Sequence, residues 1–319
     1  MVALKKSQNS IIIIGAAGRQ GKEYFHLLSK LYKISGLVDT NYKALKEAYN
    51  QSSIPLFHTV EEAIEQCSFT TAVICIPHSY HFSATLPLIN ANKTVIKEKP
   101  LALTQVEVNR YKEQEKNHIF TIVQRPFHEA FFFVQKNLYR LGKIYDFHYQ
   151  YYLGISERTK GWRSDFSLSG GGVIIDMGYH ILDVIINFFG QPEEISGALS
   201  YCYDYSGRSH LEDAATITCR YSNNQLHGSI RLNRYAESKR EYFEVLGSNG
   251  RLTMQNGFIE IKDRKGNLLE QIEISDPLNK QKMFDFYFEQ SSCPFFSEQH
   301  LNHHAVIVAL IEQLYKRIR

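Results

Sequence analysis

The sequence has 319 residues, enough for two domains of ordinary size, and its 44% hydrophobic and 22% charged residues are typical of a globular protein. The formal net charge of +3 is small, and the basic residues form no clustered face, which argues against nucleic acid or an anionic membrane as a partner. No apolar run reaches the roughly 20 residues of a membrane span, and no secretory signal precedes the short apolar run at residues 11–14.

The five cysteines are scattered along the chain, and no Cys-x-x-Cys pair occurs among them. We therefore expect neither a zinc site nor a disulfide framework. Reduced thiols in the cytoplasm are the simplest interpretation, so we predict a cytoplasmic protein without a bound metal.

The first strong pattern is a buried strand that ends in a glycine turn. Residues 10–15 read Ser-Ile-Ile-Ile-Ile-Gly, and four β-branched residues in a row are typical of a central parallel strand. The turn Gly15-Ala-Ala-Gly18-Arg-Gln-Gly21 then leads into a helical segment. A strand, a glycine turn and a helix predict a dinucleotide site, because glycines let the backbone approach a pyrophosphate at the helix N-terminus. Alone, the glycine pattern would also fit an ordinary tight turn.

The second predicted strand, residues 34–38, ends at Asp39. A carboxylate there accepts hydrogen bonds from the adenosine ribose and repels a 2′-phosphate, and no arginine follows in Thr40-Asn41-Tyr42. We therefore predict NAD as the cofactor. Two alternatives remain: Asp39 could simply cap the next helix, and Arg19 within the glycine turn keeps NADP open.

Strands and helices continue to alternate as far as residue 124, which predicts a doubly wound parallel sheet. We expect strands at residues 56–58, 71–76, 93–97 and 119–124 and helices at residues 60–67, 78–90 and 104–116. Thr59 and Glu62 have the spacing of a capping box at one helix start. Lys99, in a Glu-Lys-Pro sequence, follows a strand end, where ligands bind in such sheets. A lysine is ordinarily a solvated surface residue, so its position is what distinguishes Lys99.

After residue 124 the sequence changes character. A predicted helix at residues 131–141 precedes β-type stretches at residues 144–153, 195–203, 213–221, 225–233, 241–247 and 251–262, with turn signals at Asn223-Asn224 and Ser248-Asn249-Gly250. We predict an α/β protein: a Rossmann domain at residues 1–124 and an α+β domain with an open, mostly antiparallel sheet at residues 125–319. Its final helix, residues 302–319, would pack back on the first domain.

Residues 170–190 form a long apolar stretch. Three glycines open it, and Gly190 and Pro192 close it, which predicts a buried helix of about four to five turns. Its polar positions, spaced by four, three and four residues, fall on one helix face: Asp176, His180, Asp183 and Asn187. Solvent exposure would account for Asn187 and Asp183, whereas we expect Asp176 and His180 to line a reaction cleft.

Three motifs occur in a characteristic order: the glycine turn at residues 15–21, Glu-Lys-Pro at residues 98–100, and Gly-Gly-Gly-x-x-x-Asp-x-Gly-x-His-x-x-Asp at residues 170–183. Together they resemble the Gfo/Idh/MocA family (glucose–fructose oxidoreductase, inositol dehydrogenase and rhizopine catabolism proteins) over almost the full length. The resemblance implies an N-terminal Rossmann domain, a C-terminal domain with an open sheet, and NAD(P)-dependent chemistry at carbohydrate-type hydroxyl and carbonyl carbons. Ala16 and Gln124-Arg125-Pro126 depart from the family pattern, which leaves cofactor preference and substrate open.

By this resemblance Lys99, Asp176 and His180 match the family's catalytic Lys, site Asp and acid/base His. Neutral His180 would take the hydroxyl proton, Lys99 would stabilise the alkoxide, and Asp176 would orient the imidazole or bind a second hydroxyl. The predicted cofactor contacts are Gly15, Ala17, Gly18, Arg19, Gln20, Gly21, Asp39, Ile76, Pro77, His81, Glu98 and Lys99. The predicted substrate contacts are Arg125, Trp162, Arg163 and Tyr179. An arginine pair would suit an acidic or nucleotide-linked sugar.

We therefore expect an oxidoreductase that transfers a hydride between NAD(P) and a secondary hydroxyl or carbonyl carbon of a sugar, cyclitol or nucleotide-linked sugar. We also expect a homo-oligomer, a dimer or tetramer formed through the C-terminal sheet. Two alternatives stay open: a non-catalytic NAD-binding sugar sensor, and a carbonyl or imine reductase of a non-sugar substrate. The presence of all three catalytic-type residues argues against the sensor.

Overall fold

The computed structural model describes residues 9–114, 118–203, 211–222, 225–291 and 293–318. The chain divides into two compact units: unit 1 is Met1–Ile122 with Met283–Val308, and unit 2 is Val123–Lys282 with Ala309–Arg319. The domain limits derived from the sequence stay a prediction. The predicted turn Asn223-Asn224, the end of the helix predicted at residues 104–116, and Arg319 lie outside the described residues.

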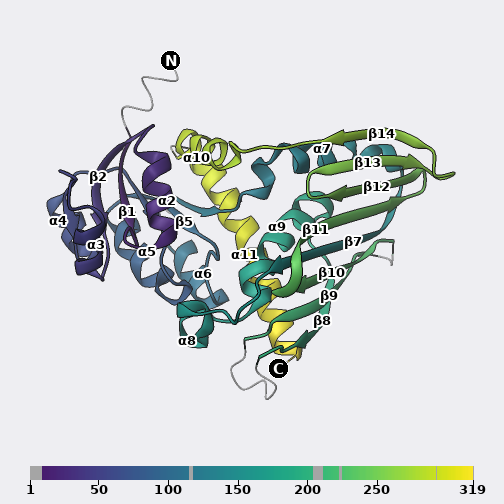
Figure 1. Ribbon diagram of the computed structural model, residues 1–319. Coiled ribbons are helices and arrows are strands. Elements are labelled where there is room, and N and C mark those ends of the chain that lie inside the picture. The colour runs from purple at the N-terminus through teal and green to yellow at the C-terminus, as the bar shows by residue number, and fades with distance from the viewer. Residues whose placement is uncertain (1–8, 115–117, 204–210, 223–224, 292, 319) are drawn as a thin grey trace. The chain divides into compact units, whose positions relative to one another are not determined.

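Unit 1 is built on a parallel sheet with the strand order β3-β2-β1-β4-β5-β6, which confirms the predicted doubly wound fold (Figure 1). Its strands are β1 (Ser10–Ile14), β2 (Lys33–Val38), β3 (Leu56–Phe57), β4 (Thr71–Ile74), β5 (Thr94–Glu98) and β6 (Ile119–Ile122). The helices along the strand crossovers are α2 (Arg19–Leu28), α3 (Tyr42–Ala48), α4 (Val60–Gln66), α5 (His81–Asn90) and α6 (Gln105–Lys112). Most of α10 (Asn279–Gln290) and the first part of α11 (Pro294–Ile318) also belong to this unit.

Local sequence explains these elements. Ile11, Ile12 and Ile13 of β1 are fully buried, as a central strand covered on both faces requires. Thr59 caps α4 and forms the predicted capping box with Glu62.

The outer edge of β6 is covered by side chains of the C-terminal helices. The Thr121 amide donates to His300 Nε2 at 2.8 Å, and the Tyr287 hydroxyl donates to the Thr121 carbonyl at 2.9 Å. Burial lowers the pKa of His300 to about 3, so its imidazole is neutral and can accept this bond. Backbone groups that an edge strand would otherwise leave open are thereby satisfied.

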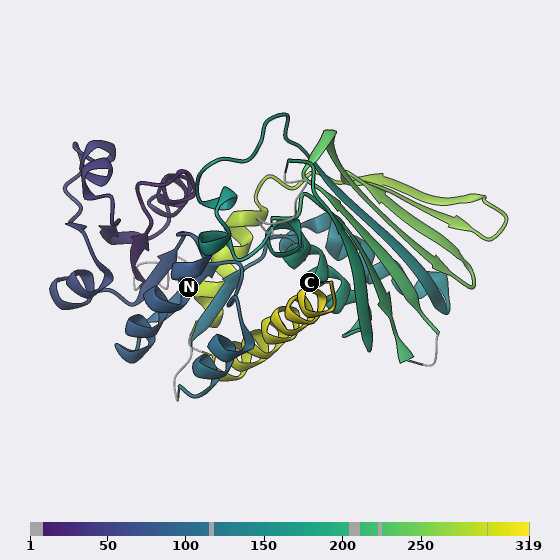
Figure 2. The ribbon, with the colours of Figure 1, turned by 90° about the horizontal axis from the view of Figure 1, so that it is seen from below.

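Unit 2 is built on a sheet with the order β14-β13-β12-β11-β7-β10-β9-β8, whose strands are labelled in Figure 1 and whose twist is visible in Figure 2. Its strands are β7 (Ile144–Gly154), β8 (Glu194–Ser200), β9 (Ala214–Arg220), β10 (His227–Asn233), β11 (Tyr235–Gly247), β12 (Gly250–Gln255), β13 (Phe258–Asp263) and β14 (Leu268–Glu273). Neighbouring strands are antiparallel except for β7 and β10, which confirms a mostly antiparallel sheet. The helices α7 (Glu129–Asn137), α8 (Phe166–Ser169) and α9 (Tyr179–Phe189) belong to this unit.

Two parts of this unit differ from the sequence-based expectation. The stretch predicted as one strand at residues 251–262 is a hairpin, because Asn256 and Gly257 adopt positive φ angles of 50° and 93° and reverse the chain between β12 and β13. β14 and α10 were not predicted, since residues 268–290 carry no clean period of two or 3.6.

The apolar stretch at residues 170–190 is not one regular helix. A π-helical turn at Ile174–Gly178 precedes α9, which ends at Gly190 as predicted. Residues 166–189 are long and apolar enough to span a membrane by length and hydropathy alone. However, 67% of their most apolar 18-residue segment is buried inside the protein, as in a core helix. Phe188 and Phe189 pack on Phe243 and Phe147 of the sheet. The expectation that Asp183 faces solvent is wrong, because Asp183 is 1% exposed.

Gly171 and Gly172, which precede this helix, allow the backbone to pack closely against Tyr315 and Glu212. A Cβ on Gly172 would lie 2.1 Å from the Glu212 carbonyl oxygen, and one on Gly171 would lie 2.2 Å from the Tyr315 hydroxyl. Buried Glu212 accepts the Ile174 amide at 2.9 Å and the Tyr315 hydroxyl at 2.7 Å. Glu212 therefore anchors the start of the π-helical turn that carries Asp176.

We expect Gly172→Ala to lower the free energy of unfolding by about 2 kcal/mol or more, because its methyl group would meet backbone that cannot move aside. Gly178→Ala is the matched control: its Cβ meets only the end of the Leu232 side chain at 3.1 Å, and alanine favours the helix. Urea unfolding measures both, and equal stability of the two variants would contradict this account.

Candidate active site

The carboxyl ends of β1 and β2 carry the glycine turn and Asp39. Gly15 has a φ of 83°, and a Cβ there would lie 2.4 Å from the Cys75 carbonyl oxygen. A Cβ on Gly21 would lie 2.2 Å from the Gly15 carbonyl oxygen. Only glycine fits at either position, so the turn stays compact and α2 begins directly beneath it.

The N-terminus of α2 is open to an anion. Gly18 caps the helix without a side-chain hydrogen bond, and the first turn contains no acidic residue. Arg19 is exposed, and Gln20 donates to Glu23 at 3.3 Å. Amide groups at such a helix start, with a cation beside them, fit the pyrophosphate of NAD.

Asp39 is half-buried at the end of β2. Its Oδ2 accepts the Ala17 amide at 2.9 Å, and its Oδ1 accepts the Asn41 amide at 2.9 Å. The N-cap of α3 is Asn41, so Asp39 is not the cap of that helix. The carboxylate links the glycine turn to the end of β2, a position that fits an adenosine ribose.

Ile76, Pro77 and His81 follow β4. His81 is 1% exposed, and its ring nitrogens lie 3.0 Å from the Ile76 carbonyl oxygen and 3.2 Å from the Pro100 carbonyl oxygen. Burial, with the field of Lys97, lowers the pKa of His81 well below its usual range. Its nitrogens face backbone carbonyls, so His81 joins two loops of the site rather than presenting a polar group to a cofactor.

The Glu-Lys-Pro turn follows β5. The hydroxyl of fully buried Tyr24 donates to Glu98, and burial together with Glu98 raises the pKa of Tyr24 well above its usual range. Lys99 is only 6% exposed, and the Lys99–Pro100 peptide bond is cis. Glu98 is therefore held by α2, and Lys99 is a largely buried amine at the carboxyl edge of the sheet.

In unit 2, Asp176 lies between two arginines. Its Oδ2 is 3.2 Å from Arg234 Nη2, and its Oδ1 is 3.6 Å from Arg163 Nε. Arg234 is 4% exposed and also donates to Thr159 Oγ1 at 3.2 Å. The carboxylate direction is therefore set by a buried guanidinium from the start of the turn after β10.

The other predicted substrate contacts differ in accessibility. The Arg163 guanidinium stacks over the Trp162 ring at 4.2 Å and is 43% exposed, which leaves both side chains within reach of a ligand. Tyr179 is fully buried, because the first turn of α9 points it into the core, and this position does not support substrate contact.

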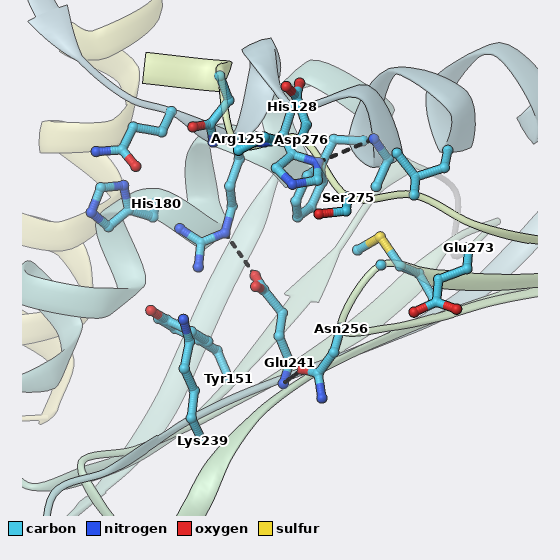
Figure 3. Close-up of a pocket in the computed structure, with 18 residues that line it drawn as sticks. Arg125, His128, Tyr151, His180, Lys239, Glu241, Asn256, Glu273, Ser275 and Asp276 are labelled. Carbon is cyan, nitrogen blue, oxygen red and sulfur yellow. Dashed lines mark hydrogen bonds and ion pairs between the residues drawn. The ribbon is translucent and has the colours of Figure 1, made fainter. Parts of the chain in front are cut away.

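His180 lines a polar cavity of about 700 Å³ within unit 2 (Figure 3). Arg125 and Tyr151 share this cavity, and the Arg125 guanidinium lies between His180 and Glu241 in the view. The remaining polar lining was not predicted from the sequence: Gln124, His128, Lys239, Glu241, Asn256, Glu273, Ser275, Asp276 and Asn279. The structure thus brings together two predicted site residues, His180 and Arg125.

A buried ion pair fixes Arg125. Its Nε lies 2.7 Å from Glu241 Oε1, which also accepts the Tyr149 hydroxyl at 2.6 Å, and the guanidinium packs on the Tyr151 ring at 4.5 Å. Burial alone would raise the pKa of Glu241, but Arg125 and the Tyr149 hydroxyl outweigh it and lower that pKa. Both charged groups are therefore ionised and oriented.

The backbone of Glu241 is itself held by Asn256, in the hairpin between β12 and β13. The Glu241 amide donates to Asn256 Oδ1 at 3.0 Å, and the Asn256 amide donates to the Glu241 carbonyl at 3.0 Å. Sequence reasoning missed Glu241 and Arg234 because one is an ordinary polar position on a strand and the other lies between two strands, and only their partners give them a role. Glu241 directly follows the exposed residues 237–240 of β11, so no pattern in the sequence marked it as a buried charge.

Two family models match the chain. The model of the Gfo/Idh/MocA oxidoreductase family with an NAD-binding Rossmann fold matches residues 10–123, and that of the family's C-terminal domain matches residues 139–253. Among curated relatives, myo-inositol 2-dehydrogenase of Thermotoga maritima is 25% identical over 71% of this chain and 68% of its own length. The NADP-dependent scyllo-inositol 2-dehydrogenase IolW of Bacillus subtilis is 25% identical over 52% of this chain. For five of the curated relatives that the chain matches, the alignment spans about half of the relative's own length.

Solved structures share the fold at low identity. A 3-ketoreductase of Actinomadura kijaniata in complex with NADP and TDP-benzene has a TM-score of 0.83 and 14% identity, covering 98% of each chain. The WlbA dehydrogenase of Bordetella pertussis in complex with NADH and UDP-GlcNAcA has a TM-score of 0.75 and 16% identity, covering 97% of this chain and 96% of its own. These likenesses concern the fold.

The Arg125–Glu241 pair predicts an acid-dependent stability. Since the pKa of Glu241 is lower when folded than its ordinary value of about 4.3, its stabilisation is complete above that value and is lost as pH falls through the folded pKa. We expect Glu241→Gln to cost about 3 kcal/mol at pH 7 and progressively less towards pH 3. Urea unfolding across this range measures the difference, with Glu260→Gln, whose partner is Lys262, as the control. A difference that grows on acidification would contradict the assignment.

Proposed function

The chain belongs to the Gfo/Idh/MocA family of oxidoreductases, and we propose that it transfers a hydride between NAD and a secondary hydroxyl or carbonyl carbon of an uncharged polyol, a sugar or a cyclitol. The observation that supports this substrate class is the polar cavity at His180, whose arginine is already neutralised by Glu241.

The charges of the cavity favour hydroxyl groups over anions. Arg125 is paired with Glu241, and Asp276 is paired with Lys282 at 2.9 Å, which leaves one further cation, Lys239, and one further carboxylate, Glu273. A hydroxyl group both donates and accepts, so it pairs with either kind of lining, whereas a carboxylate or diphosphate would find no excess of positive charge there. This differs from the acidic substrate that an arginine pair suggested, because Arg125 is committed to Glu241 and Arg163 contacts Asp176.

The residues present suggest a division of labour. NAD held at the glycine turn would supply the hydride acceptor. His180 takes the hydroxyl proton, since histidine is the side chain that most often acts as a general base. Lys99 donates to the same oxygen and stabilises its developing negative charge. Asp176, held by Arg234, binds a neighbouring hydroxyl or orients His180. Formation of a homo-oligomer through the C-terminal sheet and a cytoplasmic location stay predictions.

A substrate panel tests the proposed activity. With NAD, we expect myo-inositol, scyllo-inositol or a neutral hexose to yield NADH absorbance at 340 nm, and UDP-linked or acidic sugars to react much more slowly. Binding of these compounds without turnover would instead support a sensor. Consumption of NADPH with carbonyl or imine acceptors, and no reaction with polyols, would support the reductase alternative.

Lys99→Ala and His180→Ala should each lower kcat by roughly 100- to 10,000-fold, because each removes a group that acts on the reacting oxygen. Both proteins should still bind NADH, as followed by fluorescence titration. The matched controls are Lys22→Ala and His227→Ala on exposed surfaces, which should keep normal turnover. Full activity of either active-site variant would overturn the roles assigned here.

Asp39→Asn tests the cofactor preference. Loss of the carboxylate charge removes repulsion towards a 2′-phosphate and weakens the ribose contact, so we expect the Kd for NADH to rise roughly tenfold while that for NADPH changes little or falls. Titration of both nucleotides measures the ratio. Thr40→Ala, beside it, is the control, and an unchanged ratio in Asp39→Asn would contradict the role of Asp39.

A further inference from the structure

Lys97, in the middle of unit 1, is a fully buried lysine. It lies on β5, two residues before Lys99, and pairs in the sheet with Ile74 of β4 and Thr121 of β6. Lysines are almost never fully buried, because removing an ammonium ion from water costs several kcal/mol. The chemistry proposed above gives Lys97 no part.

The Lys97 amine is hydrogen-bonded within the protein. Its Nζ donates to the Leu101 carbonyl at 2.6 Å and to the Tyr111 hydroxyl at 3.1 Å, and it lies 4.9 Å from the centre of the Tyr111 ring. Tyr111 belongs to α6, which also carries Glu107. Burial lowers the pKa of Lys97 to about 7, while the Glu107 carboxylate acts in the opposite direction.

The bond to Leu101 closes the turn that carries Lys99. Lys97 precedes the three residues Glu98 to Pro100, and its amine binds the carbonyl of Leu101, which follows them. The side chain of Lys97 therefore spans this turn from one end to the other. The preceding carbonyl, that of Pro100, lies 3.2 Å from the His81 ring of α5. Two successive carbonyls after Lys99 thus each lie against a nitrogen of a buried side chain.

A methionine of similar length would fill the same space without a charge to desolvate, so the amine is costly for stability. One of its two hydrogen bonds goes to the Leu101 carbonyl at the end of the Lys99 turn, and the other goes to Tyr111 of α6. The amine therefore connects this turn to α6. We propose that Lys97 is a positioning residue that fixes the Glu98–Leu101 turn and thereby directs the amine of Lys99. This inference rests on the proposed function, since it assumes the role given to Lys99.

The test is Lys97→Met, assayed with the panel polyol that is oxidised fastest. We expect kcat to fall roughly 10- to 100-fold, because a displacement of about 1 Å at a reacting group has such an effect. The Kd for NADH should stay within about twofold, and the midpoint of thermal unfolding should not fall. A merely structural lysine would instead lower the unfolding midpoint and leave kcat unchanged. Wild-type kcat in Lys97→Met would overturn the proposal.

Lys93→Met is the matched control. The Lys93 amine also donates to a backbone carbonyl, that of Phe69 at 2.8 Å, and lies 4.6 Å from the centre of the Phe69 ring. This contact has the same chemistry but does not involve the Lys99 turn, so kcat should stay at the wild-type value. An equal loss of kcat in Lys93→Met would overturn the specific role of Lys97.

Double variants separate this inference from the proposed function. If Lys97 acts through Lys99, Lys97→Met should cause no further loss of kcat in a Lys99→Ala background, whereas an additive loss would overturn the inference. Full turnover in Lys99→Ala alone would overturn the proposed function itself. A loss in Lys99→Ala together with normal Lys97→Met turnover would overturn only the inference.

Tyr111→Phe serves if Lys97→Met does not fold. It removes the second acceptor of the amine and keeps the bond to Leu101. We expect kcat to fall several-fold, by about the effect of one hydrogen bond, with an unchanged Kd for NADH. An unchanged kcat in Tyr111→Phe would count against the proposal.

Discussion

Charge inside this protein is held by partners of fixed geometry, and this constraint shapes the candidate site residues of unit 2. Asp176 lies against Arg234, and Arg125 lies against Glu241, each with a side chain that is mostly buried. An ion taken out of water is tolerated only when its partners are close and directional. The contacts that make burial of these charged groups possible also restrict their side-chain rotamers. The polar groups that would meet a substrate are therefore preorganised.

Much of the fold could be predicted from the sequence because its signals are local. The β-branched run before Gly15, the Thr59 cap and the Gly190 helix end each depend on a few neighbouring residues, and each is confirmed. The parallel pairing of β7 with β10 was not predicted, because it joins strands that are distant in the sequence. The hairpin at Asn256 was also missed, since an extended pattern on both sides hid a two-residue reversal.

The sequence identified motif residues but not the residues that hold them. Arg234 is 58 positions from Asp176, and Glu241 is 116 positions from Arg125, so no local spacing connects either pair. The polar stripe from Asp176 to Asn187 was interpreted with a single helical period. The π-helical turn at residues 174–178 breaks that period, and Asp183 is enclosed by the core although its spacing indicated an outward face.

The reversal at Asn256 and Gly257 has a consequence for how this cavity could change during evolution. Two residues connect β12 to β13, and Asn256 also binds the backbone of Glu241 on β11. Inserting a residue into so short a connection would shift the strand register and turn inward side chains outward. Unlike a long loop, this wall cannot be remodelled by changes in length. New substrate preferences on this side of the cavity are therefore accessible mainly through exchange of single side chains, with the backbone retained.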